Sequence, residues 1–217
     1  MLTRIDRRPA KTFMYSRVQQ NIDLFLRSRG GETVVIDAAA GGLNNSRFFR
    51  AARVQYLGLD IDTARLRRGW AKHGDNRIAY LHGNILELEK LVALGVGGDI
   101  VLCTETINTN RLFVSQRAEQ AIDQLVSIVA SRGWLIFNVG QLDRRASVIV
   151  NSVLPRLKER FQSVEVTEYG LLHEKNQMKH YKRVNAAIVS AMSTIPGLKT
   201  GFGLRRDQAV ITCKYRC

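Results

Sequence analysis

Long apolar runs and cysteine are both scarce in this sequence of 217 residues. The longest apolar candidate, 121–139, is interrupted by Asp123 and Arg132, so we expect no segment that spans a bilayer. No apolar run follows the basic start of the chain, so we expect no signal peptide. Its three cysteines are too few and too scattered for a disulfide framework or a zinc site. These absences predict a cytoplasmic protein with no metal site.

Positive charge is abundant, and most of the excess lies near the two ends of the chain. Residues 1–30 hold seven Lys/Arg and two acids, and residues 156–217 hold twelve and five. The centre, 31–155, is nearly balanced, with fourteen Lys/Arg and twelve acids. Such basic flanks indicate an anionic partner: nucleic acid, a phosphorylated small molecule or an anionic lipid surface. A role in solubility alone stays open as the alternative.

The apolar pattern alternates between strand and helix five times after a first helix at 13–28. This alternation predicts an α/β fold with a mostly parallel sheet that is buried on both faces. We expect a helical cap at 1–30 and one domain at 31–217, with a basic insertion at about 170–207. The predicted strands are 34–36, 54–62, 78–85, 99–106, 134–140, 162–169 and 208–215. The predicted helices between them are 45–52, 63–73, 86–94, 114–131 and 147–160, the last interrupted by Pro155.

Short polar residues stand at the ends of four successive predicted strands. Asp37 opens the loop "DAAAGG", Asp60 and Asn84 close the next two strands, and Thr104 and Glu105 close the fourth. Each residue alone is explained equally well as a helix cap or a solvated turn, but four in succession indicate a ligand site. Ligands of open parallel sheets bind at this edge. Because an acid precedes the small residues and G-x-G-x-x-G is absent, the loop favours an ammonium group over a pyrophosphate.

Taken together, these residues resemble the motifs of class I S-adenosylmethionine-dependent methyltransferases over about 33–140. The resemblance implies a Rossmann-like, doubly wound sheet of seven strands with a terminal antiparallel strand, and S-adenosylmethionine as the cofactor. It places Asp37 near the ammonium end of the methionine portion, Asp60 on the ribose hydroxyls and Asn84 at the adenine amino group. Leu43 stands where a glycine is usual, as does Ala39. The implied cofactor-binding residues are Asp37, Ala39, Gly41, Asp60, Ile61, Asn84, Ile85 and Thr104.

A methyl group on a sulfonium is already activated, so alignment of the reactants and exclusion of water supply much of the rate. A hydroxyl nucleophile also benefits from a general base. Glu105 and His173 are the predicted catalytic residues. His173 follows the sixth predicted strand and faces the expected substrate entrance; its other interpretation is an inert surface histidine.

The acceptor is less constrained than the cofactor. Two signatures of nucleic-acid methylation are missing: N/D-P-P-Y/F after the fourth strand and a Pro-Cys nucleophile. We therefore expect a small-molecule or glycan-type acceptor, anionic or phosphorylated, that is methylated at oxygen. Two alternatives remain: an RNA methyltransferase that uses its basic flanks, and a non-catalytic S-adenosylmethionine-binding protein. Peripheral contact with a membrane surface also stays open.

Overall fold

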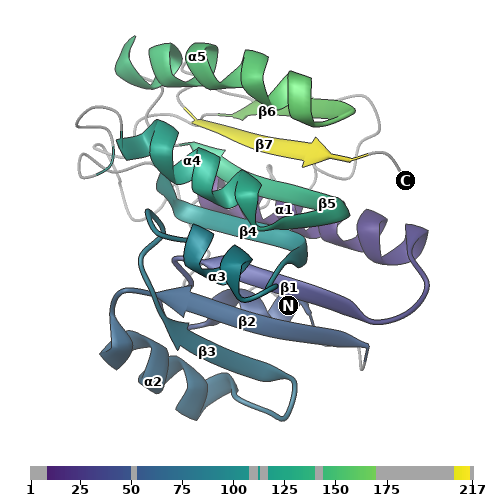
Figure 1. Cartoon of the computed structure of the whole chain (residues 1–217), viewed down its shortest axis with the longest axis vertical. Coiled ribbons are helices and arrows are strands. Elements are labelled where there is room, and N and C mark those ends of the chain that lie inside the picture. Colours follow the sequence, from purple (N-terminus) through teal and green to yellow (C-terminus); the bar gives the residue numbers. More distant parts are fainter. Residues whose placement is uncertain are drawn as a thin grey trace.

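The protein forms a seven-stranded sheet with the strand order β3-β2-β1-β4-β5-β7-β6 (Figure 1). The computed structural model describes residues 9–49, 53–107, 112, 117–139, 144–169 and 208–215. Strands β1 to β5 pair in parallel, and β7 is antiparallel to both of its neighbours. The predicted Rossmann-like, doubly wound α/β fold is confirmed. The strands are β1 Thr33–Ala38, β2 Val54–Asp60, β3 Ile78–His82, β4 Gly98–Ile107, β5 Val129–Val139, β6 Ser163–Tyr169 and β7 Gln208–Lys214.

Helices cover both faces of this sheet. Successive strand residues point to opposite faces, so Val35 packs in one core cluster and Ile36 in the other. One cluster is closed by α1, η2 and α2, and the other by α3, α4 and α5. In Figure 1, α4 lies in front of the sheet and α1 behind it. The helices are α1 Pro9–Ser28, η2 Asn44–Phe48, α2 Thr63–His73, α3 Glu89–Ala93, α4 Arg117–Ser127 and α5 Arg144–Arg160.

The first helix is fastened to the sheet by apolar and polar contacts. Phe25 meets Trp134 edge to face, with ring centroids 5.3 Å apart. Nδ2 of the buried Asn21 donates to Oγ1 of Thr212 at 2.7 Å. The segment predicted as a cap thus covers β5 and β7, although its boundary at residue 30 stays a prediction. The basic insertion predicted at 170–207 lies outside the described residues.

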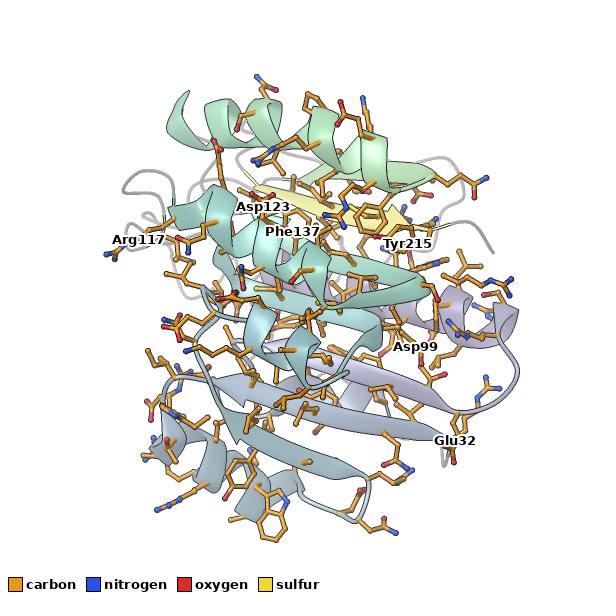
Figure 2. All side chains as sticks on the ribbon, in the orientation of Figure 1. Glu32, Asp99, Arg117, Asp123, Phe137 and Tyr215 are labelled. Atoms are coloured by element: carbon orange, nitrogen blue, oxygen red, sulfur yellow. The ribbon has the colours of Figure 1, made fainter. Side chains whose placement is uncertain are left out.

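The front face is built in the same way. Phe137 of β5 is fully buried beneath α4, whereas Asp123 of α4 points toward α5 (Figure 2). There it accepts a hydrogen bond from Arg156 at 2.9 Å, and Arg156 also bridges to Glu119 at 3.2 Å. Among the described helices, none is long and apolar enough to cross a membrane.

Three predicted helices differ from the observed ones. The helix expected at 114–131 ends at Ser127, because the chain enters β5 at Val129 and turns through Arg132, whose φ is +69°. A single 3-10 turn, η2, replaces the start of the helix expected at 45–52, and Leu43 precedes it in the left-handed region. Pro155 lies inside a continuous α5 and does not interrupt it.

Candidate functional site

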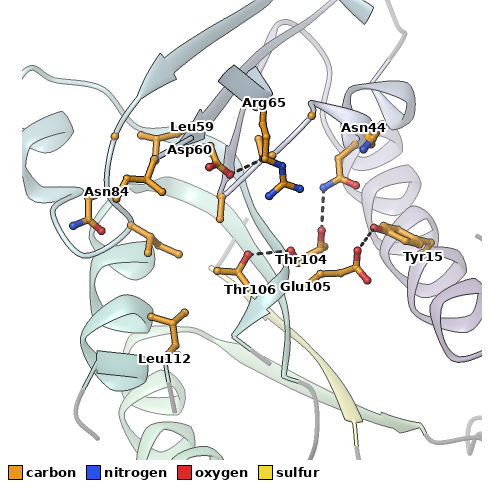
Figure 3. A pocket seen from close by; sticks show the side chains of 18 residues that line it. Tyr15, Asn44, Leu59, Asp60, Arg65, Asn84, Thr104, Glu105, Thr106 and Leu112 are labelled. Atoms are coloured by element: carbon orange, nitrogen blue, oxygen red, sulfur yellow. Dashed lines mark hydrogen bonds between the residues drawn. The ribbon is translucent and has the colours of Figure 1, made fainter. Parts of the chain in front are cut away.

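A cavity of about 460 Å³ lies at the carboxyl ends of the parallel strands (Figure 3). It lies at the point where the strand order reverses between β1 and β4. Open α/β sheets bind ligands at this point, and the volume falls within the range of about 300–1,000 Å³ that is usual for small-ligand pockets. The topology therefore selects this cavity as the candidate site.

The strand-end residues converge on the cavity as the sequence predicts, with one exception. The exception is Asp37, which is fully buried and does not line it. The predicted catalytic residue Glu105 lines the cavity, whereas His173 lies outside the described residues. The other predicted cofactor-binding residues, all in the cavity wall, are Ala39, Gly41, Asp60, Ile61, Asn84, Ile85 and Thr104.

The carboxylate of Asp60 is fixed in place by two backbone amides. Its Oδ2 accepts from the N–H of Gly41 at 2.7 Å, and its Oδ1 accepts from the N–H of Asp62 at 2.8 Å. Asp62 itself caps α2, since its side chain accepts from the N–H of Arg65 at 2.9 Å. Each carboxylate oxygen has a further lone pair, so Asp60 can still accept two hydrogen bonds from a ligand. Two adjacent hydroxyl groups match this arrangement.

The loop between β1 and η2 approaches the cavity with its backbone. Ala39 and Gly41 have φ values of +62° and +54°, in the left-handed region that disfavours side chains. Gly69 of α2 supports the loop from behind, and a Cβ added there would lie 2.5 Å from the carbonyl carbon of Gly42. Because Gly42 and Gly69 have no side chains, the backbone of the loop packs directly against the backbone of α2.

Asp37 belongs to a buried hydrogen-bond network beneath this loop. Its Oδ2 accepts from the hydroxyl of Tyr56 and from Nδ2 of Asn45, the latter at 3.1 Å. Burial raises the pKa of Asp37 to about 7; the hydrogen bonds from Tyr56 and Asn45 oppose this rise, and the nearby charge of Asp60 adds to it. Asp37 therefore does not line the cavity, and its Oδ1 has no hydrogen-bond partner among the described residues. Its place near the ammonium end of the cofactor stays a prediction.

Asn45 connects the network to the cavity. Its Nδ2 also donates to Oγ1 of Thr104 at 3.0 Å, and both residues line the cavity. The buried Oδ1 of Asn45 has no hydrogen-bond partner among the described residues. A buried acceptor without a partner is costly, so this oxygen favours a ligand that donates a hydrogen bond. Asn45 therefore lies between Asp37 and the cavity.

Glu105 closes the end of the cavity beside α1. The hydroxyl of Tyr15 donates to its Oε2 at 3.2 Å, and its backbone N–H donates to Oδ1 of Asn138 at 2.6 Å. Glu105 has a φ of +61°, a strained conformation for a residue with a side chain. Tyr15 is itself packed beneath Arg47, whose guanidinium lies 5.3 Å from the ring centroid. These contacts hold one carboxylate at the cavity wall.

At the opposite end the wall is apolar with one amide. Ile61 is 67% exposed, and it lines the cavity together with Ile85 and Asn84. Oδ1 of Asn84 accepts from the N–H of Leu86 at 3.0 Å, and its Nδ2 donates to Glu87 at 3.3 Å. The two isoleucines can pack against the face of a flat heterocycle, and the amide of Asn84 can bond to its edge. Among the described residues, no group of three His, Cys, Asp or Glu is placed to hold a metal ion.

The wall residues that sequence reasoning missed include Tyr15, Asn45 and Arg65. Tyr15 comes from α1, which is distant in sequence from every strand end. Asn45 lies in the predicted helix 45–52, and no motif in the sequence marks it as a ligand-binding residue. Arg65 lies on α2 with its guanidinium beside Gly41, at a distance of 3.0 Å from where a Cβ would stand. Only one sequence signal could have suggested that Arg65 lines the cavity: it lies five residues after Asp60, in the first turn of the next helix.

S-adenosylmethionine fits this set of groups. Its ribose offers two hydroxyl donors for Asp60, its ammonium group is a donor for Asn45, and its adenine matches the apolar end. Its positive charge suits a cavity that holds the carboxylates of Asp60 and Glu105. The residues present are therefore compatible with this cofactor.

Solved structures with the same arrangement are methyltransferases. The chain has the class I methyltransferase fold. NodS, an N-methyltransferase from Bradyrhizobium japonicum, superposes with a TM-score of 0.59 at 16% identity, over 94% of this chain and 97% of its own. The plantazolicin methyltransferase BamL, solved with S-adenosylhomocysteine, gives 0.59 at 9% identity, over 94% and 86%. An rRNA methylase from Streptococcus thermophilus gives 0.55 at 13% identity, over 91% and 95%.

Comparison of the amino-acid sequence with known families and proteins finds no match. No protein-family description matches the chain, and no curated protein matches it. The three structural neighbours act on different kinds of acceptor, so this methyltransferase fold does not by itself define the substrate.

Proposed function

We propose that the chain transfers a methyl group from S-adenosylmethionine to an acceptor bound beside Glu105. The observation that carries this proposal is the pair of acceptors in the cavity wall. Asp60 is oriented by two backbone amides, and Asn45 presents a buried oxygen without a partner among the described residues. The shared fold with known methyltransferases supports the same conclusion.

Each part of the cofactor has a matching residue. Asp60 would accept hydrogen bonds from the ribose hydroxyls, and Asn45 would accept one from the ammonium group. Asn84 would meet the adenine edge, with Ile61 and Ile85 against its ring. The backbone of Ala39 and Gly41 would follow the methionine portion. Asp37 would act indirectly, because it fixes Nδ2 of Asn45 and so aims Oδ1 of Asn45 at the cavity.

The residues at the other end would serve the acceptor. When bound, the cofactor supplies a methyl group that is activated by the adjacent sulfonium. Glu105 is placed to take a proton from an acceptor hydroxyl, and Tyr15 holds its Oε2. Thr104 and Tyr15 line the wall beside Glu105. His173 stays a candidate for the same role from outside the described residues.

A small-molecule or glycan-type acceptor, methylated at oxygen, is the first candidate. Glu105 as a base for a hydroxyl group supports it, as does the lack of nucleic-acid methylation signatures in the sequence. RNA is the second candidate, because a row of exposed cations on α2 begins at the cavity wall with Arg65, and two aromatic rings are exposed on α2 and β3. A protein that binds the cofactor without turnover is the remaining alternative.

Cofactor binding can be tested by calorimetric titration with S-adenosylmethionine and S-adenosylhomocysteine. Asp60→Asn is nearly isosteric, but an amide group cannot accept from both backbone N–H groups and the ribose. We expect it to weaken binding by about 10- to 100-fold, the loss of one or two charge-assisted hydrogen bonds. Asp62→Asn is the matched control, since asparagine keeps the helix cap. Equal affinities for the two variants would contradict the proposed ribose site.

Turnover can be tested with a tritiated methyl donor and cell extract. Label in a fraction of small molecules or glycans would support the first acceptor class, and label in RNA would support the second. Wild-type protein that binds the cofactor but labels no fraction, with or without RNA, would favour a non-catalytic role. Glu105→Gln should lose most of the transfer, and its cofactor affinity should fall far less than that of Asp60→Asn.

A further inference from the structure

The outer face of α2 is basic and carries few acids, although it lies in the part of the chain with little net charge. Residues 63–82, which comprise α2 and β3, contain five Lys/Arg and one acid, Asp75. Asp75 is paired with Arg77 at 2.9 Å. The side chains of the other four cations make no hydrogen bond or ion pair with any described residue. They are Arg65, Arg67, Arg68 and Lys72, all exposed on α2.

These cations form an ordered row. Arg65, Arg68 and Lys72 are spaced three and four residues apart, so they lie along one side of the helix. The row begins at the cavity, because Arg65 lines its wall. Positive charges about one helical turn apart, without neutralising partners, repel one another, and a chain of negative charges would relieve this repulsion.

Two aromatic rings are exposed on the other flank of α2, beside β3. Trp70 of α2 is 47% exposed and Tyr80 of β3 is 36% exposed, with ring centroids 6.4 Å apart. The indole N–H of Trp70 donates to the carbonyl of Ile78 at 3.3 Å, which holds the ring against β3. Arg67 precedes Trp70 by three residues and so lies on its side of the helix. Figure 1 shows α2 beside β3 at the end of the sheet opposite β6.

We infer that the exposed surface of α2 and β3 binds single-stranded nucleic acid, which would cross α2 between its two flanks. This surface is made of Arg65, Arg67, Arg68, Trp70, Lys72 and Tyr80. Unpaired cations supply contacts to phosphates, and exposed rings supply platforms on which unpaired bases stack. The row of cations leads to the cavity at Arg65, so the strand would pass the site of methyl transfer. For the reaction this inference rests on the proposed function, but binding alone does not require it.

An anionic membrane is the other partner that basic helices serve, and the geometry disfavours it. A helix that lies on a bilayer buries an apolar face, whereas the exposed face of α2 has one large apolar side chain, Trp70, whose N–H is already held by β3. The exposed Leu81 points to the opposite face of β3 from Tyr80, because strand residues alternate. Among the described residues of this surface, the other exposed large apolar side chain near the row is Ile61, which belongs to the cavity wall.

Binding can be measured by fluorescence anisotropy with labelled 12-nucleotide oligouridylate and oligothymidylate, without any methyl donor. If all four cations meet phosphates, the logarithm of the binding constant should fall with the logarithm of salt concentration with a slope of about −3. Arg67→Gln with Arg68→Gln should weaken binding by about 10- to 30-fold at 0.1 M salt. Lys158→Gln with Arg160→Gln, two exposed cations of α5, is the matched control and should retain wild-type affinity.

The aromatic part has its own readout. The chain has two tryptophans, and Trp134 is 5% exposed, so quenching of the exposed tryptophan reports on Trp70. We expect the oligonucleotides to quench this emission and Trp70→Leu to weaken binding at least about fivefold. A duplex of the same length should bind more weakly, because its bases are already stacked on one another.

Three results would overturn the inference: no binding at 50 mM salt, equal loss of affinity in the α2 and α5 variants, or binding without a change in tryptophan emission. Binding to phosphatidylserine vesicles with no binding to either oligonucleotide would replace it with a membrane surface. Oligonucleotide binding that survives Asp60→Asn, with the cofactor affinity lost, would separate this surface from the proposed reaction. Comparison of the two oligonucleotides then shows whether RNA or DNA is preferred.

Discussion

The buried carboxyl group of Asp37 should make the stability of the protein depend on pH. Its pKa is raised from an ordinary value of 3.8 to about 7, chiefly by burial. The folded protein therefore holds a proton that the unfolded chain releases between these two values. The contribution of Asp37 to the free energy of unfolding is therefore fully present below pH 4, falls as the pH rises, and is lost above pH 7.

The size of the effect follows from the two pKa values. One pKa unit corresponds to about 1.4 kcal/mol, so the full effect is about 4 kcal/mol, of which about 2–3 kcal/mol falls between pH 5 and pH 8. The side chain in Asp37→Asn resembles the protonated acid. Its oxygen can accept hydrogen bonds from Tyr56 and Asn45, and its NH₂ group takes the place of the acid O–H. The variant should lack this part of the pH dependence.

Urea denaturation at pH 5, 6, 7 and 8 would measure the effect. The free energy of unfolding of Asp37→Asn relative to wild type should rise by about 2–3 kcal/mol from pH 5 to pH 8. Asp62→Asn controls for the removal of one carboxylate, since asparagine still caps α2. A difference between Asp37→Asn and wild type that stays constant with pH would refute the reasoning that burial governs this group.

Three further predictions concern the walls of the cavity. Gly69→Ala would push a methyl group against the backbone of Gly42, so it should destabilise the protein by about 1–3 kcal/mol in thermal or urea unfolding and weaken cofactor binding; an unchanged midpoint would contradict the close approach. Ala39→Gly relieves a left-handed alanine worth about 1 kcal/mol, offset by the entropy of glycine in the unfolded chain, so stability should change by less than about 1 kcal/mol. Tyr15→Phe removes the hydrogen bond to Glu105, so kcat should fall while calorimetry finds the cofactor affinity unchanged; a weaker affinity with normal kcat would place Tyr15 on the cofactor instead.

Local sequence was sufficient wherever a structure depends on near neighbours. The helix predicted at 63–73 is observed at Thr63–His73, because Asp62 caps it by bonding the N–H of Arg65, three residues on. The carboxyl ends of the first four strands were predicted to within three residues, because parallel strands are nearly continuous apolar runs. Asp60, Asn84 and Thr104 therefore came together as predicted, since parallel strands end at one edge of the sheet.

Distant contacts decided the rest. The burial of Asp37 depends on Tyr56, which lies 19 residues further along the chain in a neighbouring strand. Tyr15 reaches Glu105 across 90 residues, so nothing near either residue announces the pair. The helix expected at 114–131 was cut short by the pairing of β5 with β4 and β7, which outweighs the local helical pattern.

The sequence by itself determined the order of strands and helices, the loop of small residues and the polar strand ends, because each follows from short-range periodicity and backbone sterics. The tertiary structure decided which carboxylate is enclosed and which lines the cavity, and it placed two aromatic rings beside the four unneutralised cations on the exposed surface of α2 and β3. The burial of a side chain and the charges around it depend on contacts between residues that are distant in sequence. Those contacts exist only once the whole sheet has formed.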